Sequence, residues 1–176
     1  MKWLMGLVLL GMVGLAAVFG AGSVLPREQT LIRGLSVKAP IEQVWQAITD
    51  YASSPAWTGN TRVERLSDQE GHAVWRIAGV DGHVTTLMVE VAEAPKYQRV
   101  LLLEAPGIEG GSWSFELSPQ PDGGTFVKMT QSGKLKNPLW RFLSRYFVGP
   151  DVTLQRYLEA LGQKFGGAGK VQELLS

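Results

Sequence analysis

The chain has 176 residues, and its 17 basic side chains nearly balance its 16 acidic ones, for a net charge of +1. This balance argues against a protein whose overall field attracts nucleic acid, so we expect no nucleic-acid partner. The chain has no cysteine, which excludes disulfides, thiolate catalysis and cysteine metal sites. Its hydrophobic content of 45% is ample for one domain with its own core.

The most distinctive segment runs from Trp3 to Leu25 and contains no Asp, Glu, Lys, Arg or His. In a helix these residues rise about 34 Å, enough to cross a hydrocarbon core of roughly 30 Å. Residues 1–26 are therefore predicted to form a transmembrane anchor. The alternative is a cleaved secretory signal, with Lys2 as its basic region and the small residues 20–22 as its cleavage site. The apolar run is longer than is usual for such a signal, which favours the anchor.

The side of the membrane is predicted from the charges that flank the apolar run. The very short N-terminus favours an orientation with this end in the cytoplasm, so that the domain of a single-pass protein lies on the non-cytoplasmic side. The basic residues that closely follow the run, Arg27, Arg33 and Lys38, favour the opposite orientation. We expect the first of these arrangements.

A strand and a helix are predicted directly after the anchor. Apolar and polar residues alternate over 30–37, which indicates the strand. Pro40 suits a helix start, and Glu42 then lies in the first turn, near the positive end of the helix dipole. Apolar residues follow at helical spacing, so we expect an amphipathic helix that ends near Asp50.

The stretch from 61 to 132 has the period of strands. Apolar residues alternate with polar ones, and turn residues interrupt the alternation. Asp81-Gly82 and the segment 121–124 are typical of hairpin turns. Because no helical period interrupts this stretch, it predicts an antiparallel meander of about six strands.

Two helices are predicted after the meander. Asn137 and Pro138 are typical of a helix N-cap and first turn. The last helix is expected to start near Pro150 and to carry apolar residues at helical spacing up to Phe165. The resulting order favours an α+β fold in which a curved antiparallel sheet wraps around a long C-terminal helix. The predicted division of the chain is an anchor at 1–26, a domain at 27–166 and a tail at 167–176.

Three strings resemble the START-like superfamily of helix-grip proteins, also called SRPBCC or polyketide cyclase/dehydrase-like proteins. They are VKAPIEQVW at 37–45, GSWSF at 111–115 and GKLKNPLWRF at 133–142. The first is similar to the family's opening strand and proline-started helix, the second to a late strand, and the third to a membrane-anchored bacterial branch. Members include lipid carriers, hormone receptors and aromatase/cyclases. The resemblance therefore implies a helix-grip fold with a cavity for an apolar ligand, without specifying the chemistry.

Inward-facing positions of the strands and the last helix are candidates for the cavity wall, since ligand pockets are mostly apolar with a few polar groups. The candidate cavity residues are Trp75, Ile77, Leu87, Val89, Trp113, Phe115, Val127, Met129, Gln131, Leu154, Tyr157, Leu158 and Leu161. A solid core needs the same residues at the same positions. The sequence leaves both interpretations open.

Motifs of catalysis and metal binding are not evident. His72 and His83 lie apart without the spacing of metal ligands, and the G-x-S-x-G elbow of serine hydrolases does not occur. We therefore predict no catalytic residue, no metal and no cofactor. The polar groups to test if the cavity is catalytic are Tyr51, Arg76, Glu90 and Gln131.

Basic and aromatic residues alternate between 134 and 147. Such a mixture suits contact with anionic lipid headgroups. The candidate membrane-surface residues are Lys134, Lys136, Trp140, Arg141 and Arg145. In the alternative interpretation, the rings pack on the sheet and the arginines are merely solvated.

The function that these patterns favour is a membrane-anchored START-like domain that binds a hydrophobic small molecule or lipid in an internal cavity without transforming it. One alternative is a polyketide cyclase/dehydratase-like enzyme that acts on a cavity-bound substrate. The other is a structural or interaction module with a solid core and no ligand.

Overall fold

The structure, a computed structural model, describes the chain except residues 1, 81, 106–107, 149–151, 168–169 and 175–176. The helices are α1 (Lys2–Val24), α2 (Ile41–Thr49), α3 (Pro55–Thr58), α4 (Pro138–Leu143), the π-helical turn η1 (Ser144–Val148) and α5 (Val152–Lys164). The strands are β1 (Glu28–Val37), β2 (Arg62–Gln69), β3 (His72–Ala78), β4 (Val84–Glu93), β5 (Tyr97–Glu104), β6 (Ile108–Pro119), β7 (Thr125–Leu135) and β8 (Gln172–Glu173). The predicted hairpin residue Asp81 and the predicted helix start at Pro150 lie outside the described residues.

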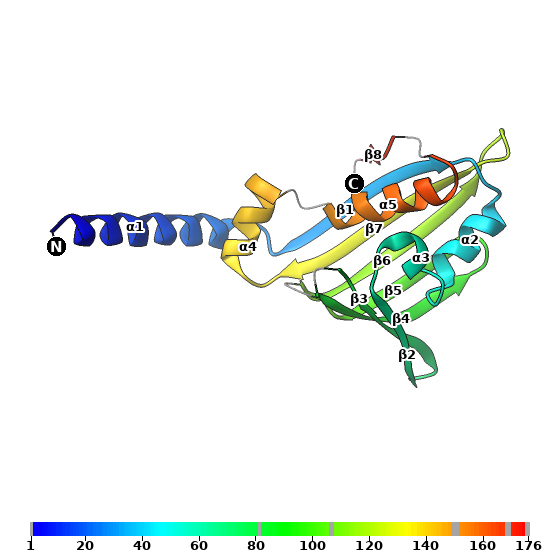
Figure 1. Cartoon of the computed structure of the whole chain (residues 1–176), viewed down its shortest axis with the longest axis horizontal. Helices are drawn as coiled ribbons and strands as arrows, with labels where there is room; N and C mark the ends of the chain where they lie inside the picture. The colour runs from blue at the N-terminus through cyan, green and yellow to red at the C-terminus, as the bar shows by residue number, and fades with distance from the viewer. Residues whose placement is uncertain (1, 81, 106–107, 149–151, 168–169, 175–176) are drawn as a thin grey trace.

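The strands form one antiparallel sheet in the order β2-β3-β4-β5-β6-β7-β1-β8. Strands β2 to β7 follow one another as neighbours, which confirms the predicted meander. Strand β1 pairs with β7 along its whole length, from Glu28 opposite Lys134 to Val37 opposite Thr125. The sheet curves around α5, and α2 and α3 lie on the same side of it (Figure 1). The predicted α+β class and the sheet curved around a C-terminal helix are confirmed.

Two helices start where the sequence predicts them. The carbonyl of Pro40 accepts hydrogen bonds from the amides of Gln43 and Val44 at the start of α2. At the start of α4, the amide of Leu139 donates to Asn137 Oδ1 at 2.9 Å, as expected of an N-cap. A side-chain cap therefore marks the start of α4, whereas α2 starts at Pro40 without one.

The core consists of two apolar clusters. The larger one joins α2 and α5 to strands β1, β6 and β7, and Leu158 of α5 is among its fully buried members. The smaller one consists of Tyr51, Leu87, Val100 and Leu102. Strands β4 and β5 contribute most of this second cluster, so the concave face of the sheet carries one cluster toward each edge.

Part of the segment predicted as a tail pairs with the domain. Strand β8 lies antiparallel to β1, and the amide of Leu174 donates to the carbonyl of Ile32 at 3.2 Å. An ion pair of 3.3 Å joins Arg33 Nη1 to Glu173 Oε1. The tail therefore extends the sheet by one short strand.

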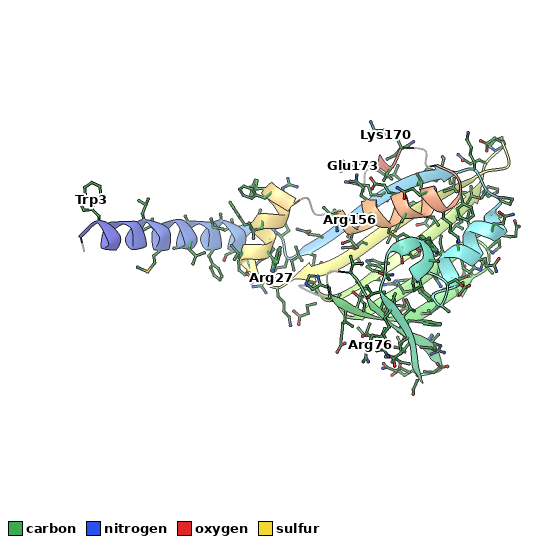
Figure 2. The ribbon with its side chains drawn as sticks, viewed as in Figure 1. Trp3, Arg27, Arg76, Arg156, Lys170 and Glu173 are labelled. Carbon is green, nitrogen blue, oxygen red and sulfur yellow. The ribbon has the colours of Figure 1, made fainter. Side chains whose placement is uncertain are left out.

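The apolar N-terminal segment folds as the single helix α1, which projects from one end of the sheet with Trp3 near its far end (Figure 2). The predicted helix is thus present at the predicted place. Over the described residues, no helix has both the length and the hydropathy expected of a membrane span. The predicted transmembrane role of α1 is therefore not supported.

The C-terminal end of α1 packs closely on α4. A Cβ atom added at Gly22 would overlap the backbone carbonyl of Pro138, so glycine permits the approach. Arg141 of α4 donates from Nη1 to the carbonyl of Leu25 at 2.9 Å. This guanidinium lies against the carbonyl end of α1, where a cation is favourable.

Candidate ligand-binding site

A cavity of about 600 Å³ lies between the concave face of the sheet and α5. Its residues come from most strands, from α4 and α5, and from the segment after α2. The wall consists of Gln29, Leu31, Ile48, Tyr51, Ser54, Thr58, Asn60, Ile77, Gly79, His83, Thr85, Leu87, Val100, Ala105, Trp113, Phe115, Gln131, Gly133, Leu135, Trp140, Thr153, Arg156 and Tyr157. Exposed side chains such as Trp140 and Arg156 mark where the cavity opens. This opening lies toward the end of the domain from which α1 projects, since Trp140 belongs to α4, on which α1 packs.

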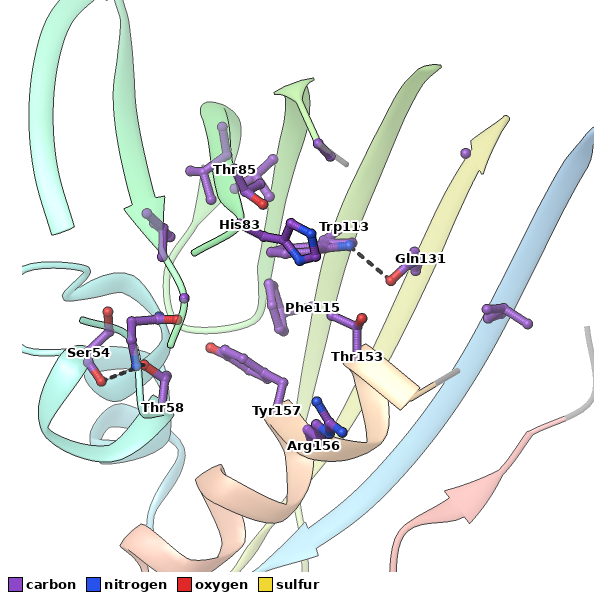
Figure 3. Close-up of a pocket in the computed structure, with 18 of the residues that line it drawn as sticks. Ser54, Thr58, His83, Thr85, Trp113, Phe115, Gln131, Thr153, Arg156 and Tyr157 are labelled. Carbon is purple, nitrogen blue, oxygen red and sulfur yellow. Dashed lines mark hydrogen bonds between the residues drawn. The ribbon is translucent and has the colours of Figure 1, made fainter. Parts of the chain in front are cut away.

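Aromatic rings form the central part of the wall. Trp113 and Phe115 are two residues apart on β6, so they share one face of the sheet. The ring of Tyr157, from α5, lies with its centroid 5.5 Å from that of Phe115 and 5.3 Å from that of Trp57. Figure 3 shows Tyr157 reaching from α5 toward Phe115. The sheet and the last helix thus meet through tilted and edge-on ring contacts beside the empty space.

Several polar groups of the wall already have partners within the protein. Trp113 Nε1 donates to Gln131 Oε1 at 3.1 Å, one of the dashed contacts in Figure 3. Ser54 Oγ donates to the carbonyl of Tyr51, and Thr58 Oγ1 donates to the carbonyl of Ser54, both at 2.8 Å. These bonds satisfy polar atoms that an apolar ligand could not pair.

The two tyrosines of the wall differ in their hydrogen bonding. The hydroxyl of Tyr51 donates to Gln98 Oε1 at 3.1 Å, whereas no described residue hydrogen-bonds the hydroxyl of Tyr157. Burial raises the pKa of both phenols well above the ordinary tyrosine value. For Tyr51 the bond to Gln98 opposes this shift of the pKa, while for Tyr157 the neighbouring Tyr51 adds to it. Both groups are therefore neutral hydrogen-bond donors near neutral pH.

Six of the thirteen predicted cavity residues line the cavity. They are Ile77, Leu87, Trp113, Phe115, Gln131 and Tyr157. Alternation along β3, β4, β6 and β7 places the first five side chains on the concave face, and Tyr157 extends toward them from α5. The curvature of the sheet leaves a space above the strands.

The other seven predicted residues lie elsewhere. Five are fully buried within the larger cluster: Val127, Met129, Leu154, Leu158 and Leu161. Trp75 and Val89 pack against the smaller cluster. Since α2 and most of α5 cover the larger cluster, side chains meet there and leave no room for a ligand. The inward face is thus partly core and partly cavity.

The structure adds wall residues that the sequence did not indicate. Most of them lie at the ends of elements, as do His83, Asn60 and Thr153. They come together only when the strand ends and the start of α5 meet, so no local pattern marks them. Tyr51, named from the sequence as a polar candidate, does line the cavity.

Two of the polar groups considered for catalysis lie away from the cavity wall. Arg76 is an exposed residue of β3, and Glu90 of β4 forms an ion pair of 3.2 Å with Arg99. Among the residues that the structure describes, no three His, Asp or Glu side chains gather as metal ligands. That no metal or cofactor is needed remains a prediction.

The predicted membrane-surface residues do not form one free basic patch. Lys134 Nζ lies 2.8 Å from Glu28 Oε1, and Lys136 Nζ lies 2.9 Å from Glu109 Oε1. Arg141 is only 3% exposed, because it packs beneath α1, and is therefore removed from the predicted surface. Trp140 and Arg145 are exposed, and Trp140 also borders the cavity.

The family model "Polyketide cyclase / dehydrase and lipid transport" matches residues 35–165. The chain therefore belongs to this family, and its fold is that of the START-like superfamily. No curated protein matches the sequence.

Solved structures share this fold at low sequence identity. The aromatase/cyclase Zhui from Streptomyces sp. R1128 is 16% identical, with a TM-score of 0.65 over 80% of this chain and 99% of that one. A START superfamily protein from Mycobacterium smegmatis is 16% identical, with a TM-score of 0.62 over 77% and 96%. Norcoclaurine synthase from Thalictrum flavum is 12% identical, with a TM-score of 0.61 over 78% and 86%. These similarities concern the fold alone.

Proposed function

We propose that this protein binds a hydrophobic small molecule or lipid in the cavity and releases it unchanged. The observation that supports the proposal is the cavity itself, whose volume of about 600 Å³ is within the range of small-molecule sites. Aromatic and aliphatic side chains such as Trp113, Phe115 and Leu87 supply most of its inner wall. Transfer of apolar ligand surface from water to this wall would drive binding.

The side-chain chemistry of the wall favours binding over catalysis. Efficient proton transfer requires a group whose pKa is near the working pH. Burial moves the pKa of Tyr51 and of Tyr157 away from that range, so neither phenol suits the role of general acid or base.

The alternative function is that of a cyclase acting on a cavity-bound substrate. His83, at the edge of the cavity, favours it because histidine is the side chain that most often serves as a general acid or base in enzymes. The fold shared with an aromatase/cyclase is compatible with it too. Mass spectrometry of a bound molecule before and after incubation distinguishes the two: a carrier returns the same mass, and a dehydrating cyclase returns a product lighter by one water.

We expect the native chain to bind the neutral apolar probe N-phenyl-1-naphthylamine saturably, at one probe per chain. The expected signal is an increase in probe fluorescence as the probe leaves water for the aromatic wall. Native mass spectrometry of the purified protein is a second readout, in which a co-purified apolar molecule supports the proposal. If the protein carries no such molecule and the probe fluorescence shows no saturable increase, the ligand-binding proposal is wrong. The function that then remains is a structural or interaction module without a ligand.

Attachment to a membrane is a second proposal, and it needs no spanning helix. Its support is the set of exposed apolar side chains at one end of the molecule, including Phe19 of α1, Tyr146 and Phe147. Exposed apolar patches of this kind mark interaction sites, and Arg145 beside them would meet anionic headgroups. The position of the domain on the non-cytoplasmic side remains a prediction from the sequence.

We expect the full chain to float with vesicles of phosphatidylglycerol and phosphatidylcholine, and less so with phosphatidylcholine alone. Arg145→Glu is expected to reduce flotation. Arg62→Glu makes the same charge change on the remote strand β2 and is expected to leave flotation unchanged. If the native chain does not float with either kind of vesicle, membrane attachment is ruled out. If both variants float equally, the surface around η1 is not the membrane contact.

A further inference from the structure

The cavity has a cationic end. Among the described residues of its wall, Arg156 carries a permanent charge, and none is an Asp or Glu that would offset it. Arg156 lies on α5 one turn after Thr153, which also lines the cavity, and Figure 3 shows these two side chains together. His83, from the other side of the opening, is a further potential donor.

The guanidinium of Arg156 is available to a ligand. No described residue forms an ion pair or a hydrogen bond with it. Other basic residues near the same end are engaged, since Lys134 and Lys136 each pair with a glutamate and Arg141 donates to the carbonyl of Leu25. Arg156 therefore offers at the edge of the cavity a planar fork that matches carboxylate, sulfonate or phosphate oxygens.

The apolar part of the wall lies deeper than Arg156. Trp113 and Phe115 lie on β6 on the side that faces α5 (Figure 3), and Leu87 lies on β4. A ligand with an apolar part and a polar part would place its apolar body against these side chains and its polar end at the opening. A negative end would use the polar part best, because a guanidinium bonds an anionic oxygen more strongly than a neutral one.

We infer that the ligand is an amphipathic acid, a molecule with an apolar body and one anionic group that Arg156 binds at the opening. The inference rests on the proposed ligand-binding function and specifies the chemical class of its ligand. The contact is a charge-assisted hydrogen bond at a partly exposed position, which is stronger than a neutral one.

The test uses two probes that share one aromatic framework. 1-Anilinonaphthalene-8-sulfonate carries an anionic group, and N-phenyl-1-naphthylamine does not. Both are titrated into the full native chain, Arg156→Gln and Arg76→Gln. Arg76→Gln removes the same charge from an exposed position away from the cavity, and so controls for the effect of net charge on the anionic probe (Figure 2).

We expect Arg156→Gln to weaken binding of the sulfonate probe by about tenfold and binding of the neutral probe by less than about twofold. Arg76→Gln is expected to change neither. Methanesulfonate, which has the anion without the rings, is expected not to compete at the same concentration. A methanesulfonate that competes as well as the ring-bearing probe would indicate a site for free anions and overturn the inference.

The two failures are distinguishable. If Arg156→Gln leaves the affinity of both probes unchanged, the amphipathic-acid inference is wrong while the cavity still binds apolar molecules. If neither probe binds the native chain saturably, the inference and the proposed function fail together.

Discussion

Leu158→Ala is expected to lower the free energy of unfolding by about 3 kcal/mol, because a buried Leu→Ala change removes apolar surface and leaves a cavity. Leu158 is 0% exposed and belongs to the larger cluster. It lies on the face of α5 that packs on the sheet, next to the turn of helix that supplies Arg156 and Tyr157 to the ligand cavity. The measurement is equilibrium unfolding in urea.

The matched control for this change is Gln155→Ala on the same helix. Gln155 is exposed, and its Nε2 donates to Glu159 Oε1 at 2.8 Å on the helix surface. Its loss is expected to change the free energy of unfolding by no more than about 0.5 kcal/mol. If Leu158→Ala cost no more than the control, α5 would not be part of the core that holds the cavity open.

Gly22→Val is expected to separate α1 from α4. An added Cβ at this position meets the backbone carbonyl of Pro138, which cannot move as a flexible side chain would. Separation also removes Leu25, the carbonyl acceptor of Arg141. The segment between α1 and β1 then becomes accessible, so we expect trypsin to cleave after Arg27 about tenfold faster, as for a locally opened segment.

Gly20→Val is the control for this prediction. It lies two residues earlier on α1, and a Cβ there has no neighbour within 4 Å. The same side chain is therefore added to the same helix without a collision. Equal cleavage rates for the two variants would show that the packing of α1 on α4 does not persist in solution.

The fold was predictable because its signals are local and repeated. Two-residue alternation identified the meander, and Pro40 and Asn137 identified two helix starts. The extent of α1 also followed from its lack of charge. Its role did not follow, because hydropathy does not show that Gly22 and Arg141 join this helix to α4.

The site was predictable only in part, because periodicity shows which face a residue occupies but not whether that face is filled. Phe115 and Met129 are cross-strand partners on β6 and β7 and both belong to the larger cluster, yet only Phe115 also lines the cavity. The difference comes from the helices above them. Arg156 illustrates the same limit. In the sequence it has the pattern of an ordinary exposed helix residue, and only the folded sheet places a cavity beside it.

The basic residues show how pairing over long distances changes a local interpretation. Lys134 faces Glu28 across the β1–β7 pair, and Lys136 reaches Glu109 from the neighbouring β6 end. Both ion pairs are exposed to solvent, where such pairs contribute little to stability. Each of them nevertheless neutralises a lysine that the sequence suggested for contact with lipid headgroups. Strand register, which the sequence does not display, decides these pairings.

If an apolar ligand occupies the space between the sheet and α5, a large side chain placed there must exclude it. Thr85→Trp places an indole in the cavity wall, whereas Ser114→Trp adds the same ring to β6 between Trp113 and Phe115, hence on the opposite face of the sheet. We expect Thr85→Trp to weaken binding of N-phenyl-1-naphthylamine at least about tenfold and Ser114→Trp to leave the affinity unchanged. Equal affinity of the native chain and a folded Thr85→Trp variant would show that the ligand binds elsewhere.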